Sequence, residues 1–181
     1  MESVLYTTYK KTVVPAMQKE LGYKNVMQVP RVIKVTLNVG YGRHAKEAAF
    51  IERVEATLKA ISGQKPVHNK AKRSISNFKT RQGMPIGVSV TLRGNRMYAF
   101  LYKLIHLVFP RVRDFRGLPL QSFDRMGNYT VGFKEHISFP EITSFTPDGI
   151  HGLQVVIHTT AKSKDEGISL LKHLGFPLKI K

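Results

Sequence analysis

The segment KTRQGMPIGVSVTLR, residues 79–93, decides the fold. It opens as a basic loop broken by Gly83, and from Ile86 onward apolar residues alternate with small polar ones. That period of two predicts a β-strand with one buried face. The residues expected to point inward are Ile86, Val88, Val90 and Leu92, and those expected to point outward are Gly87, Ser89, Thr91 and Arg93. The outward row is uncharged up to Arg93, which suits a surface that the backbone of another molecule approaches closely.

Two further segments alternate in the same way. The inward residues are Ile33, Val35, Leu37 and Val39 within 31–39, and Leu153, Val155 and Ile157 within 151–160, where Val156 is an exception. Together the three strands predict one outward face, made of Lys34, Thr36, Asn38, Ser89, Thr91, Arg93, Gln154, His158 and Thr160. Hydroxyls and amides both donate and accept hydrogen bonds, so such a face can meet ribose hydroxyls, base edges and phosphate oxygens.

The remaining elements are helices and two shorter strands. We expect strands over 64–70 and 129–133, and a helix over 3–21 with a kink or a break at Pro15. Further helices are expected over 47–62, with a stripe of apolar residues, over 96–109, with Asn95 as N-cap, and after the capping box at 163–166. Because the strands alternate and the helices interleave irregularly, the sequence predicts the α+β class. The sheet is expected to be mainly antiparallel, with helices packed on one face and the other face open for RNA. One domain of residues 1–181 is expected, with a long basic loop at about 71–83.

Charge is the strongest compositional signal. The chain has 29 Lys and Arg against 12 Asp and Glu, a net charge of +17, and no carboxylate lies between Glu55 and Asp114. Solvated faces normally mix both signs, so this one-sided stretch predicts a polyanionic partner, with nucleic acid the leading candidate. There is no cysteine, and the first residues lack the basic start and apolar run of a signal peptide. We therefore expect a cytoplasmic protein.

No motif predicts catalysis, a metal or another cofactor. Gly40-Tyr-Gly42 lacks the third glycine of a dinucleotide loop, and the seven histidines show no metal-ligand spacing. His106 is expected to be buried or half-buried in its helix. An RNA-processing enzyme with His158 as general base beside Thr160 is the alternative from another class. Binding to an anionic membrane is disfavoured, because no segment pairs a basic face with a continuous apolar one.

Several short blocks, spread in order along the chain, resemble one family. They are Met27–Arg31, Ile61–Pro66, Arg81–Gly87, Thr91–Gly94, Arg111–Gly117, Gly127–Tyr129 and Thr159–Lys162. These blocks look like those of the bacterial large-subunit ribosomal protein number five family, the carriers of 5S ribosomal RNA. The similarity runs from about Tyr6 to the C-terminus, so it covers essentially the whole chain.

The resemblance implies partners and site residues. It implies binding of 5S rRNA and large-subunit rRNA, with Asn38, Gln64 and Thr91 at positions that the family uses; Asn38 and Thr91 also lie on the outward face described above, whereas Gln64 comes from the resemblance alone. The expected rRNA contacts are Lys34, Thr36, Asn38, Gln64, Lys65, Lys70, Lys72, Arg73, Ser89, Thr91, Arg93, Arg96 and His158.

The loop at 74–83 is expected, by the same resemblance, to touch the tRNA in the P site of the ribosome. The expected tRNA contacts are Ser76, Asn77, Phe78, Lys79, Arg81 and Gln82. Phe78 either stacks on a base or turns inward to anchor the loop, and the sequence leaves both open. The family also implies a bridge to a small-subunit head protein, expected near 111–116 or 134–149. No small-molecule substrate and no membrane are expected, and the protein is expected to be ribosome-bound.

Overall fold

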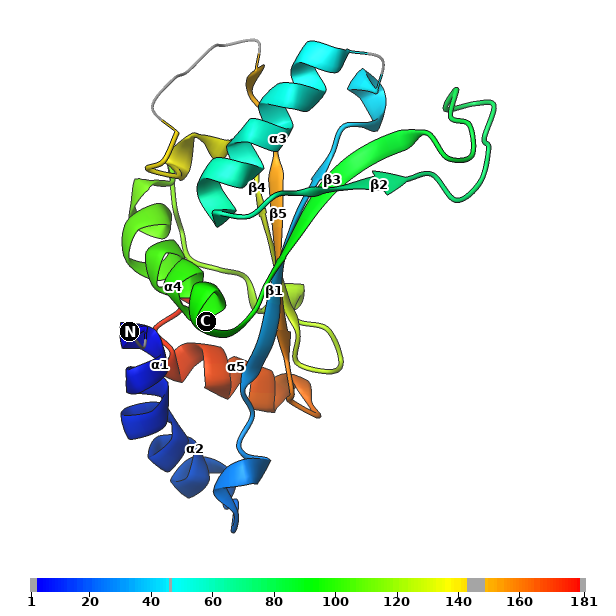
Figure 1. The fold of residues 1–181 in the computed structure, drawn as a ribbon. Coiled ribbons are helices and arrows are strands. Elements are labelled where there is room, and N and C mark those ends of the chain that lie inside the picture. The colour runs from blue at the N-terminus through cyan, green and yellow to red at the C-terminus, as the bar shows by residue number, and fades with distance from the viewer. Residues whose placement is uncertain (1–2, 46, 143–148, 180–181) are drawn as a thin grey trace. The chain divides into compact units, whose positions relative to one another are not determined.

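A five-stranded sheet is the centre of the architecture. The computed structural model describes residues 3–45, 47–142 and 149–179, and the strand order is β2-β3-β1-β5-β4 (Figure 1). The strands are β1 (Val32–Gly40), β2 (Val67–Lys70), β3 (Pro85–Leu92), β4 (Tyr129–Phe133) and β5 (Leu153–Thr159). All five predicted strands are therefore confirmed, although the one expected from residue 64 begins only at Val67.

Neighbouring strands run in opposite directions. β2 pairs antiparallel with β3. At the start of β1, the backbone N–H of Thr160 donates to the carbonyl of Arg31 at 2.9 Å. Towards the other end of β1, the Asn38 amide reaches Gln154 at 3.2 Å. Residue numbers thus rise along β1 as they fall along β5, which is the antiparallel arrangement. The predicted α+β class with an antiparallel sheet is confirmed.

The chain divides into two compact units. Unit 1 consists of Met1–Val35, Leu92–Val131 and Val155–Lys181, and unit 2 of Thr36–Thr91 and Gly132–Gln154. Unit 1 holds the helices α1 (Val4–Thr8), α2 (Val14–Leu21), α4 (Gly94–Lys103) and α5 (Lys164–His173), and unit 2 holds α3 (Ala48–Ser62). β1, β3, β4 and β5 each contribute residues to both units, and the single domain stays a prediction that one cooperative unfolding transition would test.

The core of unit 1 is built from helix pairs. The predicted break in the first helix is a π-helical turn over Tyr9–Val13, directly before Pro15, which has no N–H to donate. Helix α1 packs against α4, where the rings of Tyr6 and Tyr98 lie 4.9 Å apart. Between α2 and α5, His173 contacts the Glu20 carboxylate at 2.6 Å.

The core of unit 2 forms around α3. Its predicted stripe of Phe50, Val54, Leu58 and Ile61 is buried throughout. A pair of buried histidines lies nearby: His136 and His151 stack with ring centroids 4.1 Å apart, and the ring of His151 also meets Phe50 edge-on. Nothing in the sequence pattern indicates this pair.

Three sequence expectations were wrong in detail. Ile33 is 48% exposed and Val32 is buried instead, because the regular alternation of β1 starts only at Val35. Asn95 is not an N-cap: α4 starts at Gly94 immediately after β3, so Asn95 already lies inside the helix and Arg93 holds the cap position. His106 is exposed, on the side of its helical segment that faces solvent.

The buried histidine pair predicts acid sensitivity. Burial, together with the neighbouring His136, lowers the pKa of His151 to about 4. A histidine in the unfolded chain has a pKa near 6.5, so the unfolded state binds a proton at a higher pH than the folded state does. The free energy of unfolding is therefore highest above pH 6.5 and decreases by about 3 kcal/mol as the pH falls towards 4. In urea unfolding between pH 7 and 4, we expect the free energy of unfolding of His151→Phe to decrease less with falling pH than that of wild type. His106→Gln, at an exposed position, should keep it, and equal pH slopes in wild type and His151→Phe would contradict the assignment.

Candidate nucleic-acid interface

The outward face of unit 2 is made of linked, uncharged polar side chains. The side-chain amide of Asn38 on β1 donates to the side-chain oxygen Oε1 of Gln154 on β5 at 3.2 Å. On β3, the Ser89 hydroxyl donates to the side-chain oxygen of Asn69 on β2, also at 3.2 Å. The residues of this neutral face that the sequence predicted, Thr36, Asn38, Ser89, Thr91 and Gln154, are all partly or fully exposed. The apolar residues that alternate with them are buried from Val35 onward in β1, from Val88 onward in β3 and from Leu153 onward in β5, so the predicted alternation is confirmed over these stretches. Ile86, which was expected to point inward, is only half-buried.

Gly87 continues this row but does not leave room for a partner. A Cβ atom at Gly87 would lie 3.1 Å from the carbonyl oxygen of Val39. The close approach comes from β1 itself, where the N–H of Tyr41 donates to the Ile86 carbonyl at 3.0 Å. The glycine therefore serves the pairing of β1 with β3 rather than the approach of another molecule.

Within unit 2, cations lie along one margin of the neutral face, beside the edge strand β2. Lys65, Lys70, Lys72 and Arg73 are exposed around β2 and at the start of the basic loop. Gln64 lies just before them, where α3 has ended at the left-handed Gly63 and the Ser62 hydroxyl accepts the N–H of Gln64 at 3.2 Å. A neutral centre with a positive margin suits a polyanion whose backbone lies at the margin and whose bases or riboses lie at the centre.

The basic loop is a short, twisted hairpin extension. Ile75 and Thr80 form an antiparallel bridge, and the Ser74 hydroxyl accepts the N–H of Gln82 at 2.9 Å. Phe78 is 74% exposed, so its ring points outward and the inward alternative is excluded. The side chains of Ser76, Asn77, Lys79, Arg81 and Gln82 are exposed as well.

Unit 1 contributes its own polar residues. Lys34 and His158 are partly exposed, and Arg93 and Arg96 are exposed around the start of α4. Burial and the nearby Lys34 lower the pKa of His158, while Asp124 acts in the opposite direction. The imidazole is therefore neutral at pH 7, and it becomes protonated more readily if an anion offsets Lys34.

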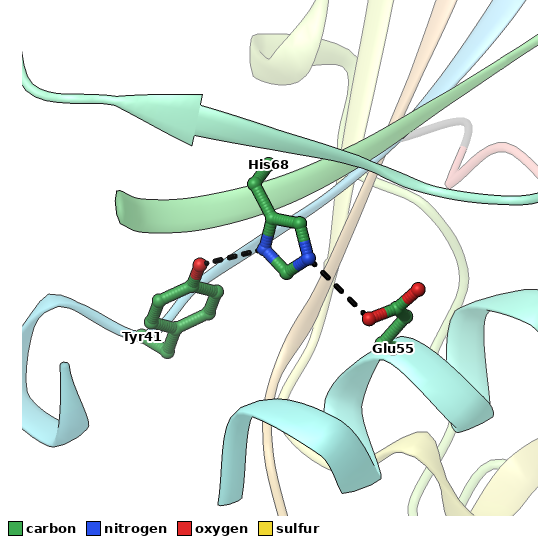
Figure 2. A network of polar contacts seen from close by, with 3 residues as sticks. All are labelled: Tyr41, Glu55 and His68. Carbon is green, nitrogen blue, oxygen red and sulfur yellow. Dashed lines mark hydrogen bonds and ion pairs between the residues drawn. The ribbon is translucent and has the colours of Figure 1, made fainter. Parts of the chain in front are cut away.

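A polar network that the sequence did not reveal holds β2 in place. The Tyr41 hydroxyl lies 3.0 Å from Nδ1 of His68, and Nε2 of His68 lies 3.3 Å from the Glu55 carboxylate (Figure 2). Burial, with a contribution from Glu55, raises the pKa of Tyr41, so the phenol stays protonated and can donate. Tyr41 is only 1% exposed. A substrate cannot reach this hydroxyl, so the network joins β2 to α3 and is not a catalytic triad.

Two further observations bear on function. Among the residues that the structure describes, no group of three or more His, Asp or Glu side chains is placed to hold a metal ion. Over the same described ranges, no helix is both long and apolar enough to cross a membrane.

These features define a class: a basic α+β protein whose antiparallel sheet carries a neutral polar face with cations at its margin. Comparison with known proteins gives the family. The family model described as "Ribosomal protein L5" matches residues 25–81, and the model described as "ribosomal L5P family C-terminus" matches residues 85–178. The chain belongs to the ribosomal protein L5 family, whose members are structural and not enzymes. The alternative of an RNA-processing enzyme with His158 as base is therefore wrong.

Curated relatives agree over almost the whole chain. The "Large ribosomal subunit protein uL5" of Microcystis aeruginosa is 50% identical over 99% of this chain and 100% of its own length. The protein of the same name from Kosmotoga olearia is 54% identical over 94% of this chain and 93% of its own. The one from Kocuria rhizophila is 51% identical over 96% and 92%.

The contact at Gly87 gives a test of the register behind the neutral face. Gly87→Ala should destabilise the protein by about 1–3 kcal/mol, because the added methyl crowds the Val39 carbonyl and forces β1 and β3 apart. Gly132→Ala in β4 is the matched control, since nothing lies within 4 Å of the position that its added methyl would take. Urea unfolding of both variants measures the difference. If Gly87→Ala is no less stable than Gly132→Ala, the strands are not in contact there.

Proposed function

We propose that the protein is a structural constituent of the large ribosomal subunit, where it binds 5S rRNA and helps to attach it to the central protuberance. The observation that carries the proposal is the neutral face of unit 2, whose hydroxyls and amides stay accessible while cations lie at its margin. Support also comes from the relatives, which are named as large-subunit proteins. The protein then acts on the ribosome in the cytoplasm.

The two parts of the surface have different tasks in this proposal. Asn38, Thr91 and Gln64 meet ribose hydroxyls and base edges of a prefolded RNA, because their side chains can donate and accept. The cations, among them Lys34, Arg93 and Arg96 of unit 1, neutralise phosphates. If about 6–10 phosphates are contacted, affinity falls on the order of 10³–10⁵-fold between roughly 50 and 200 mM salt.

The basic loop at 74–83 serves a second partner in this proposal, the tRNA in the P site. Its support is the outward Phe78 and a cavity of about 540 Å³ whose lining includes Ser76, Lys79 and Arg81, a set of hydroxyl and cationic groups that suits a phosphate. A bridge to a small-subunit head protein is proposed near 111–116 or 134–149. Arg111, Arg113 and Arg116 are exposed in the first segment, and residues 143–148 of the second lie outside the described residues.

Substitutions on the neutral face test 5S rRNA binding. Asn38→Ala and Thr91→Ala should each weaken binding by about 1–3 kcal/mol, because an RNA polar group loses its partner, with the salt slope unchanged. Thr57→Ala on α3 is the matched control, since its hydroxyl bonds the Arg53 carbonyl at 2.9 Å within the helix. Filter binding to 5S rRNA at two salt concentrations gives both quantities. Wild-type affinity in Thr91→Ala would remove the sheet face from the proposal.

Removal of the loop tests the division of tasks. Deletion of residues 74–83 should leave binding to isolated 5S rRNA unchanged and should weaken P-site tRNA binding by ribosomes assembled with the variant. Phe78→Ala should reproduce part of the second effect, by about 1–3 kcal/mol if the ring stacks on a base. The deletion removes the hydrogen bond from Gly83 to the Ala71 carbonyl but spares both residues of the bond in which Ala71 donates to Met84 at 2.8 Å, so we expect the pairing of β2 with β3 to survive. A deletion variant that no longer binds 5S rRNA would contradict this division.

A further inference from the structure

Unit 1 contains a cavity that the proposed function does not use. Its volume is about 640 Å³, within the roughly 300–1,000 Å³ of ligand sites. It lies where the connector after α2 meets the start of β1 and the segment that follows β5. The apolar part of the lining is formed by Tyr9, Val14, Tyr23, Val26, Met27 and Val29.

Val26 and Met27 form an exposed apolar lip at the edge of the cavity. Val26 is 55% exposed and Met27 is 81% exposed, on a 3₁₀ turn of which Asn25 is the N-cap. The Asn25 side chain accepts the N–H of Met27 at 2.9 Å, so this turn has a defined start. At the floor, the Tyr9 hydroxyl donates to the Pro30 carbonyl at 3.0 Å. Exposed apolar side chains such as Val26 and Met27, ordered beside a cavity, are typical of a surface that binds another molecule.

The rim of the same cavity is positive. Lys10, Arg31 and Lys162 line it against a single carboxylate, Glu166. That carboxylate already accepts the backbone N–H of Lys162 at 2.7 Å, which fixes it in place. The rim therefore favours an anionic ligand.

Two polar side chains, Gln28 and Tyr23, line the cavity in addition to the charged ones. The side chain of Gln28 is exposed at the lip and can both donate and accept. Burial, then a hydrogen bond with Glu166 and the charge of that carboxylate, raise the pKa of Tyr23 to about 12, so this phenol stays protonated. Its hydroxyl oxygen is buried, so Tyr23 contributes its ring to the wall of the cavity, and Gln28 is the polar side chain that an occupant meets.

An unstacked nucleotide has the chemistry that this site would recognise. A base presents a flat apolar surface with hydrogen-bonding edges, and extruded bases pack between aromatic and apolar side chains. The phosphates on either side of it would meet the cations of the rim. An acidic protein segment is the competing occupant, but protein interfaces are depleted of lysine, and two of the three rim cations are lysines.

We propose that the cavity between Met27, Arg31 and Lys162 binds a single unstacked nucleotide of ribosomal RNA, at a contact separate from the neutral face of unit 2. The inference rests on the proposed function in so far as the ligand is RNA. It adds a second RNA contact, which recognises an irregularity in an RNA strand by stacking. A bulged or extruded base is bound there, and a regular duplex is not.

The experiment uses two short RNA hairpins that differ only in one bulged adenosine. Fluorescence anisotropy with the full chain should show about tenfold tighter binding of the bulged hairpin, the value of stacking one base. The double variant Val26→Ser, Met27→Ser should abolish that preference and leave 5S rRNA affinity unchanged, which also shows that the protein is folded. Arg31→Gln with Lys162→Gln should weaken binding of the bulged hairpin and reduce its salt slope by about 1.4–1.8.

Each outcome separates this inference from the proposed function. Thr91→Ala should weaken 5S rRNA binding and keep the preference for the bulged hairpin, so either site can fail alone. Equal affinity of wild type for the two hairpins, or a preference that survives in the Val26→Ser, Met27→Ser variant, would overturn the cavity as a nucleotide site. Displacement of the bulged hairpin by an acidic peptide with central leucine and phenylalanine, but not by AMP, would assign the cavity to a protein partner and overturn it as well.

Discussion

The pairing of β1 with β3 is the constraint on which the neutral face depends. The side-chain period of a strand is two, so a slip of one residue would turn every outward hydroxyl and amide into the core. The pairing is close where the carbonyl of Val39 approaches Gly87, because a Cβ atom at that position would lie 3.1 Å from the carbonyl oxygen, nearer than most Cβ contacts. Because Leu37 and Val88 are fully buried, a slip would also expose apolar surface. The core and the outward face therefore specify the same register.

The edge strand β2 is stabilised from both of its faces. On one face the Asn69 side chain accepts from Ser89, and on the other His68 contacts Tyr41 and Glu55. A short edge strand with four exposed side chains has little apolar burial of its own, so these polar contacts replace a hydrophobic anchor. The basic loop at about 71–83 follows directly after the last residue of β2. The two contacts on β2 thus fix the direction in which the loop leaves the sheet.

Much of the fold follows from local patterns, and the exceptions have a common cause. The strands, the α3 stripe and the cap at Ser163 depend on residues close together in the chain, and all three were predicted. In the cap, Ser163 accepts the N–H of Glu166 at 3.4 Å, but the Glu166 carboxylate takes the N–H of Lys162 rather than that of Ser163. The stacked pair of His136 and His151 joins positions that only the tertiary fold brings together. No periodicity reveals such a pair.

The candidate site divides in the same way. Asn38, Ser89 and Thr91 could be placed outward from alternation alone, and the structure leaves them accessible. The side chain of Gln64 could not be oriented in this way, because it lies in the connector between α3 and β2, where apolar and polar residues do not alternate. Phe78 could not be oriented either, since both directions suit a loop aromatic until the bridge between Ile75 and Thr80 is known. The cavity of unit 1 was not predicted, because its lining comes from residues 9–14, 23–31 and 160–166, which only the tertiary fold brings together.

Separation of neutral and charged groups has a consequence for how such a surface recognises RNA. Phosphates are the same along every strand, so cations raise affinity without reading shape or sequence. Hydroxyls and amides gain little in water unless a matching partner meets them, and a mismatch leaves them unsatisfied at a cost of about 1–3 kcal/mol. The side chains of Asn38 and Gln154 are already hydrogen-bonded to each other in the free protein. Because they are ordered before RNA binds, less conformational entropy is lost on binding. In the proposed function, the uncharged centre therefore discriminates between RNAs, and the lysines and arginines at the margin determine how strongly any RNA is bound.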